Sequence, residues 1–447
     1  MKKIFGIRTI GKLLCGLTFW SLPAYAIDET GDKGLANEEV VVFDNAHSDI
    51  PYRIPALTYT RDGKLIAVCD YRVNKADIGI NNENGLWHID EVMRVSHDNG
   101  KTWGPIRTVA QGNEEACDWR VAFGDPSIVA DRESNEVLMG CLAGKIGYWG
   151  ANRSTNERRQ ECVFFRSMDG GETWDNGTRV TDDIWNLYDG TLPGGESAQG
   201  LFFTSGKIMQ SRYVKVGKYY RLYIAHPVRP EDFNRRIGTF VIYSDDFGRT
   251  WKVLGGTSTV PSIAQDESKV EELPDGSVLL SCRDKDGGRR MNVFTYTDAK
   301  RADGRWGQEV MPSNMTRDNV NAVNGGTLIV PAKRKMDGKS VFIVLQSVPH
   351  NKARVTMGFF YKVLTGRADY NTAERLGTGW TKGLKVTDAT ACYSTMVLLN
   401  DGQIGLLYEK NAYNNGYDIV FQCLSLEEIT GGKYSYYAKA KRKPFLK

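Results

Sequence analysis

The stretch Ser96-His-Asp-Asn-Gly-Lys-Thr-Trp103 occurs three times in this chain, and its repetition is the first guide to the architecture. The other copies are Ser167-Met-Asp-Gly-Gly-Glu-Thr-Trp174 and Ser244-Asp-Asp-Phe-Gly-Arg-Thr-Trp251, so all three fit Ser-x-Asp-x-Gly-x-Thr-Trp. The copies begin 71 and 77 residues apart. Five fixed positions at a similar spacing indicate an internal structural repeat.

Each copy has the composition of a tight turn between two β-strands. The aspartate can hydrogen-bond to the backbone of its own turn, and the glycine tolerates positive φ. A strand-like run precedes every copy, at residues 92–95, 162–165 and 240–243. The tryptophan begins the return strand, where it can pack over the turn. We therefore interpret the motif as a structural turn shared by successive units and not as a catalytic site.

Strand-like segments continue along the chain, and turns rich in Gly, Asp and Asn separate them. The expected strands include residues 39–43, 65–69, 137–141, 222–224, 277–282, 341–346, 355–361, 396–399 and 403–409. The sequence shows no long amphipathic helix, and residues 427–429 are the candidate for a short one. This pattern predicts an all-β protein.

The length of the repeat suggests how these strands are arranged. A unit of about 70–77 residues fits about six times into the chain, and four short strands would fill each unit. A closed ring of four-stranded blades leaves few exposed sheet edges. We predict a six-bladed β-propeller, with a β-sandwich or a β-helix as the alternative. Ala302–Trp306 and Gly377–Trp380 are candidates for decayed copies of the turn.

The composition and the N-terminus indicate an exported globular protein. The 447 residues are 41% hydrophobic and 25% charged, which is the composition of a globular protein. The net charge is +4, and no run of basic residues is long enough to suggest binding to nucleic acid. A positive start, a short apolar run at 13–22 and the small residues around Tyr25 predict a signal peptide over residues 1–26. The apolar run is too short for a stable membrane span. We expect a single domain over residues 27–447 in the periplasm or the medium.

The cysteines beyond residue 26 show no C-x-x-C pair and no zinc-ligand spacing. They are Cys69, Cys117, Cys141, Cys162, Cys282, Cys392 and Cys423. Most stand beside strand-like residues, so we expect buried free thiols. One disulfide, for example through Cys117, stays open as an alternative in an exported protein.

Four arginines stand beside apolar or strand-like residues, where a solvated arginine is less expected: Arg53, Arg72, Arg283 and Arg354. Strand ends in a propeller can converge on one face. Guanidinium groups gathered there would bind an anion, and a carboxylate best of all through paired hydrogen bonds. The alternative is four separate surface or structural ion pairs.

Two acids and one tyrosine complete the set of candidates. Asp77 lies in a loop rich in Gly and Asn, Glu267 stands just before an expected strand, and Tyr393 begins another. Taken singly, each residue also has an ordinary interpretation, as a loop acid, a surface glutamate or a core tyrosine.

Together these residues resemble the bacterial exo-α-sialidases (neuraminidases) of the Asp-box family that includes the trypanosomal trans-sialidases. The shared elements are the three repeats, Arg53-Ile-Pro55, Asp125-Pro-Ser127, Glu267 followed by Arg283, Ser-x-Pro before Arg354, Tyr393-Ser394 and Tyr408-Glu409. The resemblance runs from about Val40 to Leu426, and the order and spacing of the elements make it specific.

The resemblance implies a propeller of the sialidase type and a substrate of sialylated glycans. It assigns the sialic acid carboxylate to an arginine triad, Arg53, Arg283 and Arg354. Arg72 and Asp125 resemble residues near the 4-hydroxyl group of the sugar, and Glu409 resembles the acid that orients Arg53. Trp119 and Trp149 are candidates for the wall of the N-acetyl pocket.

The implied activity is retaining hydrolysis of terminal α-linked sialic acids from glycoproteins, glycolipids and oligosaccharides. Tyr393 is then the nucleophile, Glu267 its base and Asp77 the acid that protonates the leaving oxygen. A neutral phenol avoids the repulsion that a carboxylate nucleophile would meet at an acidic sugar, and tyrosine sialidases are an established exception among glycosidases. No metal or cofactor is implied. The alternatives are a trans-sialidase, an intramolecular trans-sialidase, and a sialic-acid-binding propeller without catalysis.

Overall fold

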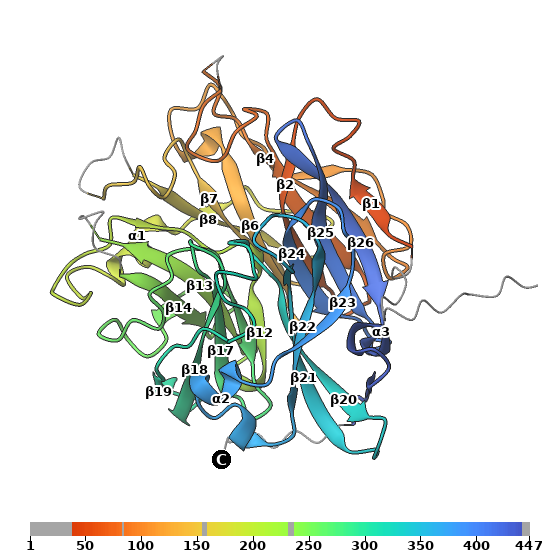
Figure 1. The fold of residues 1–447 in the computed structure, drawn as a ribbon. Helices are drawn as coiled ribbons and strands as arrows, with labels where there is room; N and C mark the ends of the chain where they lie inside the picture. Colours follow the sequence, from red (N-terminus) through yellow and green to blue (C-terminus); the bar gives the residue numbers. More distant parts are fainter. Residues whose placement is uncertain (1–37, 83–84, 154–158, 231–236, 440–447) are drawn as a thin grey trace, which may run out of the picture. The chain divides into compact units, whose positions relative to one another are not determined.

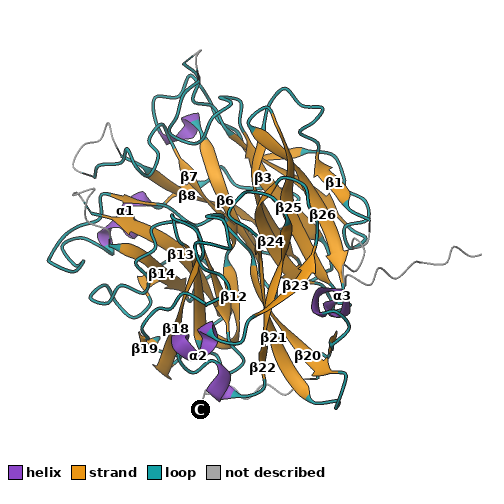
Figure 2. Ribbon diagram, viewed as in Figure 1, coloured by secondary structure: helices purple, strands orange, loops and turns teal. Residues whose placement is uncertain are grey.

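The computed structural model of the chain describes residues 38–82, 85–153, 159–230 and 237–439. The signal peptide predicted for residues 1–26 lies outside them. The described residues belong to one compact unit, Ala36–Lys447. Strands dominate this unit and helices are few and short (Figure 2), which confirms the all-β prediction.

The strands form six antiparallel blades arranged as a β-propeller, as the repeat length predicts. Blade one contains β2 (Tyr52–Tyr59), β3 (Leu65–Tyr71), β4 (Asp90–Ser96) and β5 (Arg107–Ala110). Blade two contains β6 (Phe123–Ala130), β7 (Val137–Ala143), β8 (Glu161–Ser167) and β9 (Thr178–Arg179). Blade three contains β10 (Gly200–Leu201), β12 (Met209–Val216), β13 (Tyr219–Arg229), β14 (Gly238–Ser244) and β15 (Lys252–Val253).

The second half of the chain continues the pattern. Blade four contains β16 (Ser268–Glu272), β17 (Val278–Arg283), β18 (Arg289–Asp298) and β19 (Asp303–Trp306). Blade five contains β20 (Thr327–Arg334), β21 (Ser340–Pro349), β22 (Met357–Leu364) and β23 (Thr381–Lys385), with β27 (Tyr434–Tyr436) added beside β20. Blade six contains β24 (Ala391–Leu398), β25 (Ile404–Tyr413) and β26 (Gly416–Leu424).

Two strands join neighbouring units of the ring. β1 (Val40–Phe43) pairs with β26, so that the start of the described chain completes blade six; in Figure 1 the red β1 lies beside the blue β26. β11 (Gly206–Lys207), in the interruption between β10 and β12, pairs in parallel with β6 of blade two. Pairing of this kind leaves fewer open edges for association with other chains.

The three repeated stretches form the same turn between the last two strands of blades one, two and three: β4 and β5, β8 and β9, and β14 and β15. In the first copy, Ser96 Oγ donates to Asp98 Oδ1 at 2.8 Å and accepts from Gly100 N at 2.9 Å. The Thr102 amide and hydroxyl both donate to the Asp98 carboxylate, at 2.9 and 2.6 Å. The other two copies make the same four contacts. The interpretation of the motif as a structural turn agrees with this geometry.

The proposed remnants of the turn lie at the outer strands of blades four and five. Trp306 ends β19, the outer strand of blade four, and Trp380 immediately precedes β23, the outer strand of blade five. Both indole rings are mostly buried and donate to backbone carbonyls, Trp306 to Leu254 and Trp380 to Leu376. Trp380 therefore has the place of the tryptophan in the first three blades, just before the outer strand, whereas Trp306 lies at the end of its strand.

Asp98 should make folding sensitive to acid. Burial disfavours its charge, but hydrogen bonds from Thr102 and Ser96 outweigh this and lower its pKa from 3.8 to about 2. Because the folded-state pKa is depressed, the stabilisation is present above the unfolded-state pKa and disappears as pH falls from about 4 towards 2. Asp98→Asn should therefore show a smaller loss of melting temperature over that interval than the unaltered protein. Thermal unfolding from pH 5 to pH 2, with exposed Asp49→Asn as the control, tests this; identical pH dependence in all three proteins would contradict it.

The helices are the short α1 (Thr181–Asn186), α2 (Ala373–Gly377) and α3 (Leu426–Thr430), with 3-10 turns at Trp119–Val121 and Arg367–Asp369. α3 contains the predicted segment 427–429, whereas α1 and α2 were not predicted. The Ser425 side chain caps α3 by accepting a hydrogen bond from the Glu428 amide, and the Glu428 carboxylate accepts one from the Ser425 amide. Within the described ranges, no helix is long and apolar enough to cross a membrane.

All seven cysteines of the described chain are free thiols. Five are buried, Cys423 is half-buried and Cys117 is exposed. This agrees with the expectation of buried free thiols and leaves the alternative of a disulfide through Cys117 without support.

Candidate active site

A cleft of about 500 Å³ collects seven of the nine side chains predicted for the site. They are Arg53, Asp77, Asp125, Glu267, Arg283, Arg354 and Tyr393, contributed by blades one, two, four, five and six. The other two, Arg72 and Glu409, lie behind them and contact them. The arginines are therefore not scattered surface ion pairs, which was the alternative left open by the sequence.

Irregularities in the inner strands place three of these side chains. The strand register shifts between Arg53 and Ala56 in β2, between Gly124 and Ser127 in β6, and between Ala391 and Ser394 in β24. Such bulges end regular pairing and redirect side chains. These shifts lie at Arg53, Asp125 and Tyr393. The regular pairing of β2, β6 and β24 is therefore interrupted beside the cleft.

Three guanidinium groups surround the ring of Tyr393. The Cζ atoms of Arg53, Arg283 and Arg354 lie 5.5, 5.8 and 6.0 Å from the ring centroid. The Tyr393 side chain is mostly buried. Positive charges at this distance favour an anion in the cleft and interact with the electron-rich ring face.

The three arginines have different partners. Arg53 donates to Glu409, and Arg283 contacts both Glu267 and Asp266. Arg354 has no carboxylate partner among the described residues, and its polar partner is the hydroxyl group of Tyr417. The Arg354 guanidinium is therefore free to bind a carboxylate brought by a ligand.

The hydroxyl group of Tyr393 lies between a base and a cation. Arg283 Nη1 donates to the Tyr393 oxygen at 2.7 Å, and a hydrogen bond from Tyr393 reaches Glu267. Burial acts to raise the pKa of Glu267, but the charge of Arg283 and hydrogen bonds from Asp266, Tyr393 and Arg283 lower it to about 2. Burial raises the pKa of Tyr393 well above 10.0. At neutral pH the pair is thus a carboxylate that can accept the proton of a neutral phenol.

Asp266 is the neighbour of this pair that the sequence analysis missed. Burial and the charge of Glu267 raise its pKa to about 8, so it is mainly protonated at neutral pH. It hydrogen-bonds to Glu267 and lies 3.1 Å from Arg283 Nε. Its position next to Glu267 in the sequence was the available signal, but a pair of acids in a loop is common on protein surfaces.

Glu409 ties two blades together beneath the cleft. It is fully buried on β25 and accepts from Arg53 Nε at 2.8 Å, from the Ile54 amide at 2.9 Å and from the Tyr393 amide at 3.1 Å. One carboxylate therefore fixes an arginine of blade one and the backbone of Tyr393 in blade six.

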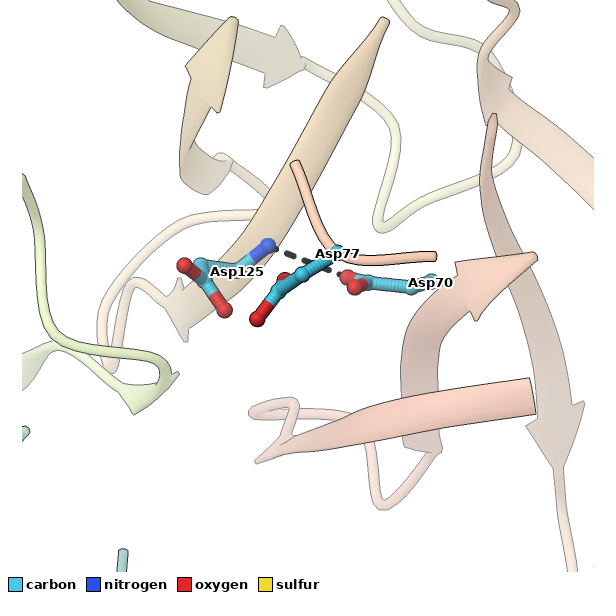
Figure 3. Close-up of side chains that lie close together, drawn as sticks. All are labelled: Asp70, Asp77 and Asp125. Atoms are coloured by element: carbon cyan, nitrogen blue, oxygen red, sulfur yellow. Dashed lines mark hydrogen bonds between the residues drawn. The ribbon is translucent and has the colours of Figure 1, made fainter. Parts of the chain in front are cut away.

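A second group of acids surrounds Arg72, which is buried just after β3. Its Nη2 atom donates to Asp70 and to Asp77, both at 2.8 Å. Figure 3 shows the carboxylates of Asp70, Asp77 and Asp125 facing one another. One oxygen from each carboxylate lies within 4.8 Å of the other two. Oxygen ligands at this spacing could hold a hard cation. Here the guanidinium of Arg72 already supplies the positive charge between two of them.

Burial raises the pKa values of two acids of this group, Asp70 and Asp125. It raises the pKa of Asp70 to about 6, against the opposing charge of Arg72. It also raises the pKa of Asp125 well above 3.8, and the charges of Asp77, Asp70 and Glu267 act in the same direction. Asp125 can therefore offer a carboxyl proton to an oxygen in the cleft.

Aromatic side chains form another part of the cleft wall. Tyr148 and Trp149 both line the cleft, and the Trp149 side chain is largely exposed. Trp119, the other tryptophan considered from the sequence, instead packs edge-on against Phe123 at 5.9 Å. The sequence could not separate the two because both stand in turn-rich segments of blade two.

Comparison with known proteins places these features in a family. A family model described as a BNR repeat-like domain matches residues 87–406. The sialidase of Micromonospora viridifaciens is 28% identical over 393 residues, which are 85% of this chain and 53% of the relative. The sialidase of Paraclostridium sordellii is 25% identical, over 86% of this chain and 87% of the relative. This chain therefore spans about half the length of the first of these relatives.

Solved structures share the fold. The Hadza microbial sialidase Hz136 superposes with a TM-score of 0.62 at 22% identity, over 85% of this chain and 66% of that one. A leech intramolecular trans-sialidase superposes with a TM-score of 0.64 at 15% identity, over 90% and 72% of the two chains. The chain belongs to the family of BNR repeat-like domains, and its relatives confirm the resemblance to bacterial sialidases seen in its sequence.

Proposed function

We propose that this protein is a retaining exo-α-sialidase that releases terminal sialic acids from glycans. The observation that carries the proposal is the set of three guanidinium groups around the ring of Tyr393, whose hydroxyl group also contacts Glu267. Sialic acid carries a carboxylate on its anomeric carbon. A ligand whose carboxylate binds these arginines would hold that carbon beside the phenol.

The first chemical step forms a covalent sialyl-tyrosine. The oxygen of Tyr393 attacks the anomeric carbon, its proton passes to Glu267, and the bond from that carbon to the glycosidic oxygen breaks. Asp77 protonates the departing oxygen, and this kind of proton transfer is worth roughly 10²–10⁴-fold in rate. The hydrogen bond from Arg283 stabilises negative charge on the phenolic oxygen as its proton leaves.

The second step releases the sugar. Asp77, now a carboxylate, takes a proton from water as the water oxygen attacks the anomeric carbon. The bond to Tyr393 breaks, and the tyrosine recovers its proton from Glu267. Two displacements at one carbon give net retention of configuration. The sequence resemblance assigns Arg72 and Asp125 to a hydroxyl group of the bound sugar; of the two, Asp125 lines the cleft, whereas Arg72 lies behind Asp77.

Turnover of an aryl α-sialoside tests the proposal. The purified protein should release the phenol, and NMR of the first product should show the α-anomer. Binding of sialosides without cleavage from pH 4 to pH 9 would overturn catalysis in favour of a binding protein.

Product analysis separates hydrolysis from transfer. Free sialic acid as the main product, with or without lactose, is the expected result. A sialylated lactose would indicate a trans-sialidase, and an anhydro sugar would indicate an intramolecular one.

We also propose that the protein acts after export. The support is the predicted signal peptide over residues 1–26, which would leave a single catalytic domain over 27–447. Mass spectrometry of the exported protein should show Ile27 as its first residue; a protein retaining Met1 in the cytoplasm would contradict this.

A further inference from the structure

Two residues in the inner strands adopt the left-handed backbone conformation beside the cleft. Ile54 in β2 has φ 59° and Asp125 in β6 has φ 58°. Positive φ is a strained conformation for a non-glycine residue, and it is tolerated where surrounding contacts enforce it. Both residues lie at the register shifts that redirect side chains into the cleft.

A buried acid from the preceding blade holds each of these strained residues. The Ile54 amide donates to Glu409 on β25, at 2.9 Å, and the Asp125 amide donates to Asp70 on β3, at 3.0 Å. β25 and β3 are the second strands of blades six and one. Both acids are fully buried.

Each acid also binds one arginine. Glu409 accepts from Arg53 Nε at 2.8 Å, and Asp70 accepts from Arg72 Nε at 2.9 Å and from Nη2 at 2.8 Å. The same arrangement, an acid with one strained amide and one arginine, thus occurs twice, one blade apart. The sequence resemblance pointed to Glu409 but not to Asp70.

We propose that Asp70 is a positioning residue for the acid step of the reaction. It acts through Arg72, whose Nη2 atom contacts Asp70 and Asp77 at the same time. Asp70 accepts from both Nε and Nη2 of Arg72, whereas Asp77 accepts from Nη2 alone. It also fixes the backbone from which Asp125 projects. This inference rests on the proposed function, in which Asp77 protonates the leaving oxygen.

The effect of removing Asp70 follows from the charges around it. Facing Asp70 are Arg72 on its own segment, Asp77 in the next loop, Asp125 on β6 and Glu91 on β4, its partner in the strand register. Without the Asp70 charge, Arg72 would pair with Asp77 alone. The guanidinium would lose its second anchor, and the Asp77 carboxyl group would no longer be held in one place beside the leaving oxygen.

The leaving group distinguishes this role from general damage. An aryl sialoside with a good leaving group needs little protonation, whereas a sialyl oligosaccharide needs the acid fully. Asp70→Asn should lower kcat about 10- to 100-fold on the oligosaccharide and less than about threefold on the aryl substrate. Equal losses on both substrates, or no loss on either, would overturn the proposal.

Glu91→Gln is the matched control. Glu91 is also fully buried, next to Asp70 across the strand pair, and its carboxylate oxygens have no hydrogen-bond partner among the described residues. Burial raises its pKa well above 4.5, so the amide replaces a neutral acid of the same shape. Kinetics unchanged in Glu91→Gln are expected; the same leaving-group dependence as in Asp70→Asn would overturn a specific role for Asp70.

Two further measurements keep the test decisive. If Asp70→Asn does not fold, Asp70→Glu replaces it, because it keeps the charge but displaces the carboxylate, and the same leaving-group dependence is expected. NMR of arginine Nε–H groups tests the contact without turnover: the Arg72 signal should be protected from exchange in the unaltered protein and exposed in Asp70→Asn. If no sialoside is cleaved, the proposed function fails, while an unprotected Arg72 signal would independently refute the positioning contact.

Discussion

Tyr393→Phe is expected to reduce kcat by at least about 10³-fold while leaving the protein folded. The ring stays, so its packing among the three guanidinium groups is kept. Glu267 and Arg283 remain paired with each other when the hydroxyl group is gone, so no buried charge is left alone. What disappears is the atom that would form the covalent bond in the proposed mechanism, so water would have to attack the anomeric carbon directly.

The control for this variant is Tyr223→Phe. The hydroxyl group of Tyr223 is buried and hydrogen-bonds to Tyr296 at 2.7 Å, away from the cleft. Loss of that contact should cost about 0.5–1.5 kcal/mol of stability and leave kcat unchanged. Rapid quenching of the unaltered enzyme, followed by peptide mapping, should place one sialyl group on Tyr393. Turnover of Tyr393→Phe within tenfold of the unaltered enzyme would remove Tyr393 from the nucleophilic role.

The sequence predicted the fold through local chemistry. The repeated turn can be read without any tertiary information because Asp98, Ser96 and Thr102 satisfy one another within a few residues. The repeat length then gave the number of blades. The pairing of β1 with β26 could not be read in this way, because it joins residues almost 380 positions apart, such as Val41 and Val420, and no local pattern marks them as partners.

The candidate site was predicted to a different degree for different residues. Arg53, Arg283 and Tyr393 could be named from motifs, and the structure brings them together. Asp70 and Asp266 could not, because their roles depend on contacts from other blades or on burial that an acidic residue rarely tolerates. Asp70 follows Cys69 at the end of a buried strand, where the pattern predicts an apolar residue, and that departure was the signal available. Helices this short show no clear periodicity, so α1 and α2 were not predicted, and the equally short α3 was named only as a candidate.

Arg354→Met should separate carboxylate recognition from structural effects better than any other change in the triad. Loss of Arg53 would leave the buried acid Glu409 without its arginine, and loss of Arg283 would do the same to Glu267; a buried charge without its partner costs about 3–5 kcal/mol. Arg354 pairs with no acid among the described residues, so its replacement should change the melting temperature little.

The substrate itself supplies the control for Arg354. A charge-assisted contact with the sugar carboxylate is worth about 1.5–3 kcal/mol, so kcat/KM for a sialoside should fall about 10- to 150-fold in Arg354→Met. A substrate whose carboxylate is blocked as a methyl ester cannot make this contact, so the two proteins should process it at similar rates. Arg354→Lys should recover only part of the activity, because a lysine keeps the charge but not the paired geometry. Equal losses on acid and ester would mean that Arg354 shapes the cleft without binding the carboxylate, and the arginine triad would then be reduced to a pair.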